Sequence, residues 1–445
     1  MSKYSKDDIM RLVEEEDVEF IRLQFTDIFG MLKNVAITAG QLGKALDNRC
    51  IFDGSAIEGF VRIDESDMYL HPDLDTFEIF PWRPQQGKVA RLICDVYGVD
   101  QTPFLGDPRY VLRRAKERAE KMGYHFNVGP ECEFFLFHTD EEGLPTTNTH
   151  ERAGYFDVAP IDLGENVRRD IVLTLEEMGF EVEASHHEIA PGQHEIDFQY
   201  VDVLTAADNI MTFKMAAKTI AKRHGLHATF MPKPKEGVNG SGMHINMSLA
   251  DESGKNVFVD ETDSRGYSRI AYHFMAGILH HMKAMTILTN PLVNSYKRLI
   301  PGYDAPIYIA WSATSNRSSL IRLPSARGES TRIELRCPDS AMNPYLALAA
   351  CLQAGLSGIE EKMEIPESIQ GNFFSISPEE LEKRGVERLP ETLGEAIELY
   401  ENDAFIREVL GEHIFTKYLE AKKKEWRDFR AQVTDWEVGE YLYKY

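Results

Sequence analysis

The sequence has little cysteine, and its charge is strongly biased toward one sign. The 445 residues include 5 cysteines, an odd number, and no two of them have CxxC spacing. A disulfide framework or a thiolate zinc site is therefore not expected, and a reducing cytoplasm fits best. Basic residues number 49 against 72 acidic ones, giving a net charge of -23. Such a surface repels nucleic acid and anionic lipid, so we expect neither as a direct partner.

Long apolar runs and simple nucleotide-binding sequences are also missing. No apolar run is long enough to span a bilayer, and Met1 to Asp8 lacks the apolar stretch of a signal peptide. The most apolar segment, Tyr345 to Leu356, is interrupted by Gln353 and predicts a buried helix. There is no internal repeat and no Gly-rich Walker sequence, so any ATP must be bound by another route. We expect a cytoplasmic globular protein.

The first hundred residues predict a small α+β unit. Ser5 can cap a first helix, with Asp8 completing a capping box. The alternation of apolar and polar residues predicts strands at Val18 to Phe25, Met31 to Ile37 and Val89 to Val96, the first two joined by a turn at Asp27 to Gly30.

The turn-rich segment Asp100 to Asp107 predicts a linker, which divides the chain into domains 1–103 and 104–445. Beyond it, strand-like segments such as Phe134 to Phe137 alternate with helical ones. Helices are expected at Pro108 to Lys121, Glu165 to Met178, Asp208 to His224 and Ser268 to Thr289. The tail from Pro378 onward is expected to be mostly helical, with Lys422 to Lys424 on a solvated face.

Acidic residues recur at spacings that suit a metal site. Glu131 and Glu133 are two apart in a predicted strand, so their side chains share one face. Glu188 and Glu195 flank a Pro-Gly turn, and a hairpin would bring them together. Taken singly, an exposed acidic strand and a polar loop explain these segments equally well.

A histidine and several arginines complete the pattern. His244 follows the glycine-rich turn Asn239 to Gly242, where backbone amides can approach a ligand closely. In Thr331 to Arg336 the alternation is strict, so Arg332, Glu334 and Arg336 share a face, and Arg298, Arg317, Arg322 and Arg327 lie upstream. A structural histidine and an ion-paired sheet face remain the alternatives. Together, five glutamates, one histidine and these arginines favour Mg²⁺ or Mn²⁺ and phosphoryl transfer.

These segments resemble the bacterial type I glutamine synthetases nearly end to end. The resemblance rests on Phe52-Asp53-Gly54-Ser55, the Glu131/Glu133 strand, His186-His187-Glu188, Asn239 to His244, Asn294 to Arg298 and Asn316-Arg317-Ser318. It implies an α+β fold: a small N-terminal β-grasp-like domain and a large catalytic domain with an antiparallel sheet surrounded by helices. It also implies a dodecamer of two hexameric rings, with each active site between two subunits.

The resemblance further implies an ATP-dependent glutamate–ammonia ligase acting through γ-glutamyl phosphate, and it assigns roles. One Mg²⁺ or Mn²⁺ site would use Glu133, Glu188 and Glu195, and the second Glu131, His244 and Glu334. Glutamate would be held by Arg298, Arg336, Asn239 and Gly240, and the nucleotide by Glu183, Ser248, Arg317, Arg322 and Arg332. Asp53 of a neighbouring subunit, Tyr155 and Asp304 would serve ammonium.

Several positions depart from the family pattern or concern control. Ala56 replaces a serine, Asp304 replaces a glutamate, Lys235 replaces an apolar residue, and one residue is extra in Thr314-Ser315. Phe374 stands where relatives controlled by adenylylation carry a tyrosine, so that control is not expected. Arg62 matches the arginine of the glutamine-inhibited Gram-positive branch, whose inhibited form binds nitrogen-responsive transcription regulators. An ion pair with Asp64 or Glu65 is the structural alternative for Arg62.

Three rival functions fit parts of the same pattern. A sibling ligase would join glutamate to a polyamine or another amine on the same phosphoryl machinery. A non-catalytic relative would have lost metal glutamates, yet all five are present. A two-metal phosphohydrolase is disfavoured by the arginines matched to glutamate binding.

Overall fold

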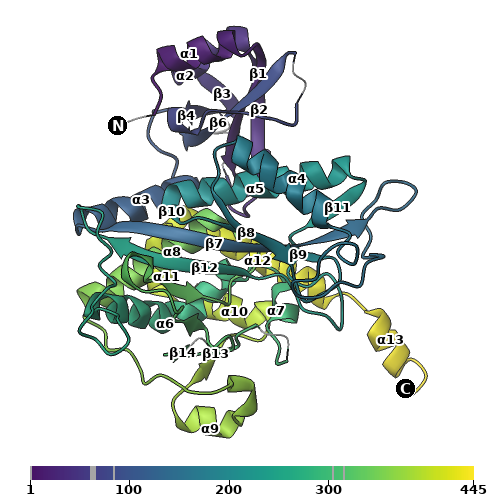
Figure 1. The fold of residues 1–445 in the computed structure, drawn as a ribbon, viewed down its shortest axis with the longest axis vertical. Coiled ribbons are helices and arrows are strands. Elements are labelled where there is room, and N and C mark those ends of the chain that lie inside the picture. The colour runs from purple at the N-terminus through teal and green to yellow at the C-terminus, as the bar shows by residue number, and fades with distance from the viewer. Residues whose placement is uncertain (1–2, 61–66, 84–85, 303–304, 314–315) are drawn as a thin grey trace.

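The computed structural model describes residues 3–60, 67–83, 86–302, 305–313 and 316–445 (Figure 1). Arg62, Asp304 and the Thr314-Ser315 pair, all singled out in the sequence, lie outside these residues. The described chain forms an N-terminal domain above a larger C-terminal domain, and its last helix projects from the body.

The N-terminal domain is a twisted sheet with helices on one side. The strand order is β2-β1-β6-β4-β3, with β5 also paired to β6, and β1 and β6 run parallel. The elements are α1 (Lys6–Glu15), β1 (Val18–Thr26), β2 (Leu32–Thr38), α2 (Leu42–Leu46), β3 (Cys50–Asp53), β4 (Asp67–Pro72), β5 (Glu78–Ile79) and β6 (Lys88–Tyr97). Ser5 caps α1 with the predicted capping box, and the three predicted strands are confirmed within a residue or two.

The C-terminal domain is built on a second sheet, ordered β14-β15-β16-β12-β7-β9-β8, with β10 and β11 also paired to β7. Its described ladders are antiparallel except for β14 against β15, which run parallel. The strands are β7 (His125–His138), β8 (Val182–His187), β9 (Gln193–Phe198), β10 (Val201–Asp202), β11 (Leu226–Thr229), β12 (Met243–Ala250), β14 (Trp311–Ser312), β15 (Ile321–Arg322) and β16 (Ile333–Leu335). The short pair β13 (Tyr308–Ile309) and β17 (Glu387–Arg388) lies apart.

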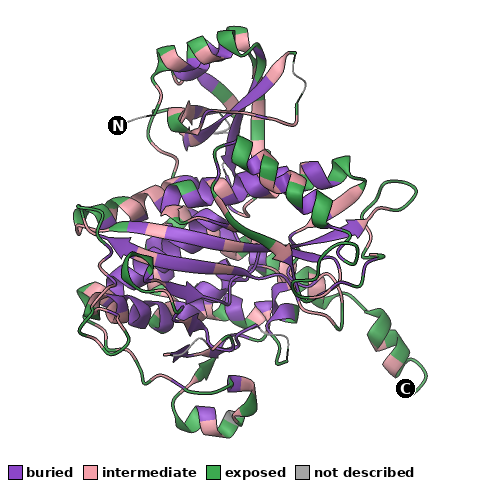
Figure 2. Cartoon of the chain, in the orientation of Figure 1, coloured by how far each residue is buried: buried purple, intermediate pink, exposed green. Residues whose placement is uncertain are grey.

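Helices cover this sheet and supply most of the core, which is the buried interior seen in Figure 2. The helices of this domain, including the projecting α13, are α3 (Pro108–Lys121), α4 (Glu165–Glu177), α5 (Val203–Arg223), α6 (Arg269–Thr289), α7 (Ser295–Arg298), α8 (Pro344–Glu360), α9 (Pro378–Lys383), α10 (Leu393–Glu401), α11 (Ala404–Leu410), α12 (Glu412–Arg430) and α13 (Asp435–Tyr441). The predicted buried helix is α8. It packs so closely on α6 that a Cβ atom at Gly277 would lie 2.0 Å from the Ala354 carbonyl oxygen. No helix in the described ranges has the length and apolarity to cross a bilayer.

Two sequence predictions were wrong in detail. Helix α5 begins at Val203 rather than at Asp208, because the Asp202 side chain caps it by accepting from the Leu204 amide. Lys422 is 3% exposed instead of solvated. Its ammonium lies 2.8 Å from Glu425 and above the Phe29 ring, so α12 packs against the N-terminal domain.

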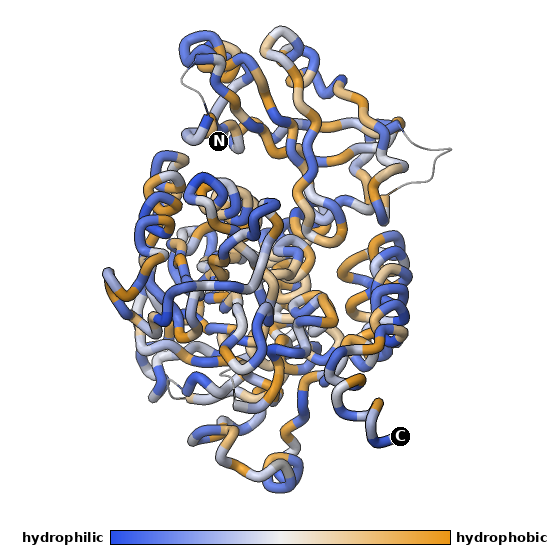
Figure 3. Tube along the Cα trace, turned by 90° about the vertical axis from the view of Figure 1, so that its right-hand side faces the viewer, coloured by the Kyte–Doolittle hydropathy of each residue, from blue (hydrophilic) through white to orange (hydrophobic). Residues whose placement is uncertain are grey.

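The two domains are joined by a hairpin tip and, separately, by the ion pairs of Arg109 with Asp73, Asp95 and Asp208. Ile28, at the tip between β1 and β2, is fully buried in the core of the C-terminal domain. Asn343 donates to the carbonyl oxygens of Asp27 and Ile28 at 3.1 and 3.2 Å. Figure 3 shows the two lobes side on, with apolar residues continuing across their junction.

Candidate active site

Sheet register brings the metal-site glutamates together. In the pairing of β7 with β9, Glu131 lies directly opposite Asp197, and Glu133 lies opposite Glu195. Opposed residues of an antiparallel pair point to the same side, so four carboxylates occupy one patch of one sheet face. The shared face that the sequence predicted for Glu131 and Glu133 is confirmed by their common contacts with His244, at 3.0 and 4.0 Å.

The hairpin of β8 and β9 adds further ligands. Glu188 follows β8, and its amide donates to the Gln193 carbonyl oxygen at 2.8 Å, which closes the turn. His186 lies 3.6 Å from a carboxylate oxygen of Glu188 and 3.6 Å from one of Glu195. One ligand atom each from His186, Glu188 and Glu195 lies within 4.8 Å of the others, a spacing suited to one cation.

Strands β12 and β16 supply the other side of the patch. His244 Nδ1 lies 3.0 Å from Glu131 and 3.7 Å from Glu334, and Asn246 donates to Glu131 at 2.9 Å. Glu334 is fully buried between the guanidinium groups of Arg322 and Arg336. The predicted group of Glu131, His244 and Glu334 is thus adjacent in space, and Glu195 also approaches Glu131 and His244.

Crowding of like charges perturbs these carboxyl groups. Burial, and then the charge of Glu188, raises the pKa of Glu133 to about 8. Burial and Glu131 raise the pKa of Asp197 to about 8. Burial favours the neutral form of Glu131 too, but hydrogen bonds from His244 and Asn246 prevail and lower its pKa to about 2. These carboxylates repel one another when they are ionised, and an imidazole lies beside them. Such a group of ligands suits hard divalent cations such as Mg²⁺ or Mn²⁺.

A cavity of about 450 Å³ opens over this patch. The predicted metal ligands Glu131, Glu133, Glu188, Glu195 and His244 line it, but the fully buried Glu334 does not. The rest of the lining includes Tyr155, Asn239, Arg298, Arg317, Arg322 and Arg336. A hydrogen bond with Tyr155 raises the pKa of Arg317, so this guanidinium stays charged. At Gly240 a Cβ atom would lie 2.2 Å from the Pro232 carbonyl oxygen, so no larger residue fits beside Arg298.

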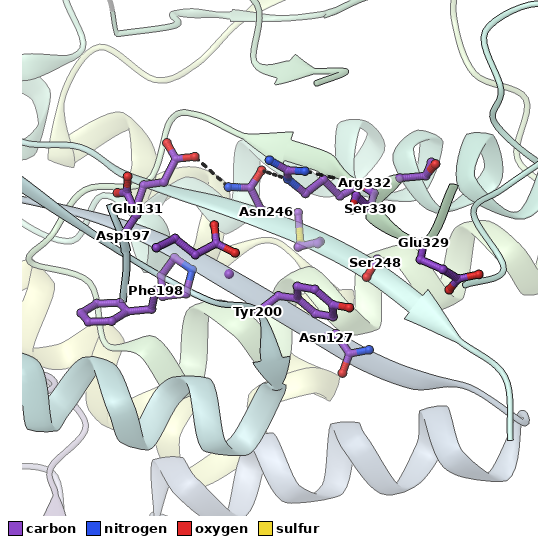
Figure 4. Close-up of a pocket in the computed structure, with 15 residues that line it drawn as sticks. Asn127, Glu131, Asp197, Phe198, Tyr200, Asn246, Ser248, Glu329, Ser330 and Arg332 are labelled. Carbon is purple, nitrogen blue, oxygen red and sulfur yellow. Dashed lines mark hydrogen bonds between the residues drawn. The ribbon is translucent and has the colours of Figure 1, made fainter. Parts of the chain in front are cut away.

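A second cavity of about 260 Å³ adjoins the first, and Glu131 and Asp197 line both (Figure 4). Glu183, Ser248 and Arg332 line it as well, so these three predicted nucleotide residues lie together. Arg332 donates to Asn246 at 3.0 Å, and Asn246 in turn donates to Glu131.

Asp53 does not line either cavity of its own chain. It ends β3 in the N-terminal domain, is exposed, and accepts from the amide and hydroxyl of Ser55 at 2.8 and 2.6 Å. An exposed position is what a role in another subunit requires.

Sequence reasoning missed two acidic groups. Asp197 could have been found, because it lies two residues beyond Glu195 and so shares its strand face. Glu151 gave no such signal, since it lies in a loop far from the strands it contacts. Its carboxylate is 2.6 Å from His187 Nε2 and accepts from the amides of Gly192 and Leu163.

Glu151 belongs to a buried polar cluster behind the metal-site hairpin. His187 Nδ1 lies 2.6 Å from the Glu188 carbonyl oxygen, and the Phe156 amide donates to the His187 carbonyl oxygen at 3.1 Å. The Glu151–His187 pair therefore ties the hairpin bearing Glu188 to the loop bearing Tyr155. Supporting contacts of this kind orient the side chains that bind the ion in metal sites.

Comparison with known proteins agrees with this geometry. Residues 17–99 match the family "Glutamine synthetase, beta-Grasp domain", and residues 105–441 match "Glutamine synthetase, catalytic domain". The chain is 62% identical to a glutamine synthetase of Clostridium saccharobutylicum over 445 residues, covering 100% of both chains. It is 57% identical to one of Staphylococcus aureus over 443 residues, covering 99% of both.

Solved structures give the same result. A structure described as "GmaS/ADP complex-Conformation 1" has a TM-score of 0.89 at 31% identity, covering 98% of this chain and 99% of that one. A glutamine synthetase of Plasmodium falciparum has a TM-score of 0.87 at 25% identity, covering 99% of both. The α+β architecture expected from the resemblance is confirmed. The chain belongs to the glutamine synthetase family.

Proposed function

We propose that this protein joins ammonia to the side-chain carboxylate of glutamate, using ATP and giving glutamine, ADP and phosphate. The observation that carries the proposal is the crowded carboxylate patch shared by two cavities, one of which is rich in arginine. Glutamate's side-chain carboxylate attacks the γ-phosphate, forming γ-glutamyl phosphate and releasing ADP. Ammonia then displaces phosphate from the acyl carbon.

Two divalent cations, Mg²⁺ or Mn²⁺, are proposed as cofactors. Glu133, Glu188 and Glu195 would hold one, and Glu131, His244 and Glu334 the other. When bound, they would supply positive charge that offsets the phosphates. His186 and Asp197 border the same patch and are further candidate ligands.

The smaller cavity is proposed to take the nucleotide, in contact with Glu183, Ser248 and Arg332. Its phosphates would then reach the shared carboxylate patch, where Arg317 and Arg322 line the larger cavity. Fixed guanidinium groups stabilise the charge that develops during transfer. One of the similar solved structures is described as an ADP complex, which supports nucleotide binding here.

Glutamate is proposed to lie in the larger cavity, held by Arg298 and Arg336 with Asn239 and Gly240. Arg298 is fixed for this task, because its guanidinium donates to the carbonyl oxygens of Cys337 and Arg336 at 2.7 and 3.3 Å. Arg336 donates from Nε to the Arg317 carbonyl oxygen at 3.0 Å. A preorganised arginine loses little entropy when a carboxylate binds.

The amine site is proposed to form between subunits, with Asp53 of a neighbour taking a proton from ammonium beside Tyr155 and Asp304. The homo-oligomer would be a dodecamer of two hexameric rings. Support comes from the C-terminal segment around α13, which projects from the body with Trp436, Leu442 and Tyr443 at 65%, 78% and 100% exposure. Exposed apolar surface of this size favours a protein partner.

Three untested expectations belong to the same proposal. The domains would be 1–103 and 104–445, and the protein would act in the cytoplasm. Arg62 would mediate inhibition by glutamine, and nitrogen-responsive transcription regulators would bind the inhibited form. Arg62→Ala should then lose glutamine inhibition while keeping basal activity, and a fully inhibited variant would contradict the role.

The first experiment measures phosphate release from ATP with Mg²⁺ and glutamate, adding ammonium or one of a panel of amines. Release that requires ammonium and yields glutamine is expected. Release that ignores ammonium but responds to another amine would make the protein a sibling ligase. Ala56→Ser and Asp304→Glu would then test whether these two departures set the choice of amine.

A further inference from the structure

A cavity of about 520 Å³ lies at the seam between the two domains, and it shares one lining residue, Phe198, with the smaller cavity of the proposed active site. Strand β6 of the N-terminal domain forms one wall, and α3 and α5 of the catalytic domain form another. Its charged lining consists of Lys3, Arg91, Arg109, Arg113, Lys116, Asp73, Asp75, Glu78, Glu181, Asp202 and Asp208.

Four of these five cations have acidic partners. Arg109 bonds Asp73, Asp95 and Asp208 at 2.7 to 2.8 Å, and Arg113 bonds Asp95 at 2.7 Å. At the cavity rim, Lys116 lies 2.8 Å from Asp202, and Lys3 lies 3.8 Å from Glu78. The positive charges of this seam are therefore almost entirely matched within the protein.

Arg91 is different. It is 4% exposed, yet its buried Nε and Nη1 have no hydrogen-bond partner among the described residues. Asp208 and Glu78 act on Arg91 through their charge, but neither forms an ion pair with it in the described chain. Glu78 is its cross-strand neighbour in the pairing of β5 with β6, but the two side chains do not meet in an ion pair. A buried guanidinium without hydrogen-bond partners is costly, and an ion, a ligand or ordered water that bonds it would offset this cost.

We propose that Arg91 binds the carboxylate of a small ligand that enters this seam. The planar fork of arginine matches two carboxylate oxygens. A single negative charge is favoured over a phosphate dianion, because the lining acids already equal or exceed the cations. Glu181, exposed and unpaired in the described chain, gives the ammonium group of an amino acid a partner at the rim.

Such a ligand would contact both domains at once. It would stabilise their docked arrangement, since a ligand that binds only the native state shifts the unfolding equilibrium. Asp53, which we place in a neighbour's amine site, is carried by the N-terminal domain. The seam is thus a point from which a small carboxylate could influence the assembled enzyme.

Equilibrium dialysis of the full-length oligomer, without substrates, tests the site with radiolabelled acetate, glycine and inorganic phosphate. Because carboxylates can also enter the proposed glutamate site, only binding that depends on Arg91 counts. We expect Arg91→Met to weaken carboxylate binding at this site at least tenfold. Arg22→Met is the matched control, since Arg22 lies opposite Arg91 in the pairing of β1 with β6 but does not line the cavity.

The possible outcomes are distinct. Arg91-dependent binding of acetate and glycine supports a simple carboxylate, and a preference for glycine supports a zwitterion. No Arg91-dependent carboxylate binding up to about 10 mM overturns the proposal, as does tighter binding of phosphate. Should Arg91→Met fail to fold, Arg91→Lys keeps the charge without the fork, and acetate should raise the urea midpoint of the unmodified protein more than that of Arg91→Lys; equal shifts would overturn the proposal. None of these readouts needs turnover, so failure here is distinct from failure of the ligase proposal.

Discussion

The seam and the active site each hold a cluster of charged side chains, and the two clusters differ in how their charges are matched. At the seam, Arg109 is surrounded by three aspartates within 2.8 Å. Burial would lower the pKa of Arg109, but the aspartates hold it well above its ordinary value. At the active site, acids face acids, and burial with mutual repulsion raises the pKa values of Glu133 and Asp197 to about 8.

This difference separates stability from function. Matched buried charges need nothing from outside the chain, and removing one member of a pair destabilises the fold because the other is left uncompensated. Like charges crowded on one sheet face are unfavourable until a cation arrives, so folding prepares a binding site at a cost in stability. Arg91 is the exception at the seam, and its lack of a partner is the reason we assign it a ligand.

The largest effect is expected for Arg109→Met, which removes the cation at the centre of the seam cluster. Removing the cation leaves the buried Asp208 without an ionic partner, while Arg113 still pairs with Asp95, and we expect a loss of about 3–5 kcal/mol in the free energy of unfolding. Urea unfolding at fixed subunit concentration measures it. Arg113→Met is the matched control on the same helix, because its side chain is one-third exposed and a loss of at most about 1 kcal/mol is expected. Equal losses for the two variants would contradict the seam's role.

Glu334→Gln removes one charge from the active site without changing its volume. The second cation loses a ligand, and Arg322 and Arg336 lose their buried partner. Since changes to residues behind a metal ligand already cost about 10–100-fold, we expect kcat to fall at least about 100-fold. Steady-state phosphate release measures this. The exposed Glu360→Gln should keep its rate, and a normal rate for Glu334→Gln would remove Glu334 from the site.

Glu151→Gln tests whether the buried cluster positions the hairpin. Loss of the ion pair with His187 should loosen Glu188 and weaken Mg²⁺ affinity about 10-fold, with a smaller effect on the KM for ATP. Calorimetric titration with Mg²⁺ measures the affinity. Glu165→Gln is the control, since Glu165 accepts one amide bond in the same loop region but is exposed. Unchanged metal affinity in Glu151→Gln would reduce the cluster to a packing role.

The smallest expected effect is in proton release. With pKa values of about 8, Glu133 and Asp197 hold protons at pH 7, and a bound cation must displace them. Mg²⁺ binding should therefore release protons at pH 7, and apparent affinity should rise with pH until the groups ionise above about pH 8. Calorimetry in two buffers of different ionisation enthalpy counts the protons. Mg²⁺ binding without proton release at pH 7 would contradict the shifted pKa values.

Much of this protein was determined by local sequence. The capping box at Ser5, the span of α3 and the buried helix α8 follow from caps and apolar periodicity, which act over a few residues. Strict alternation also set which side chains share a strand face, as with Glu131 and Glu133.

Only the tertiary structure decided which strands are neighbours, and therefore which charges meet. Asp197 faces Glu131 because β9 pairs with β7 in one register, and Glu151 reaches His187 across 36 residues of chain. Lys422 is buried because the N-terminal hairpin covers α12. Strand pairing and burial depend on long-range packing, which no local sequence pattern encodes. The matched charges of the seam and the crowded like charges of the active site therefore come together only in the folded chain.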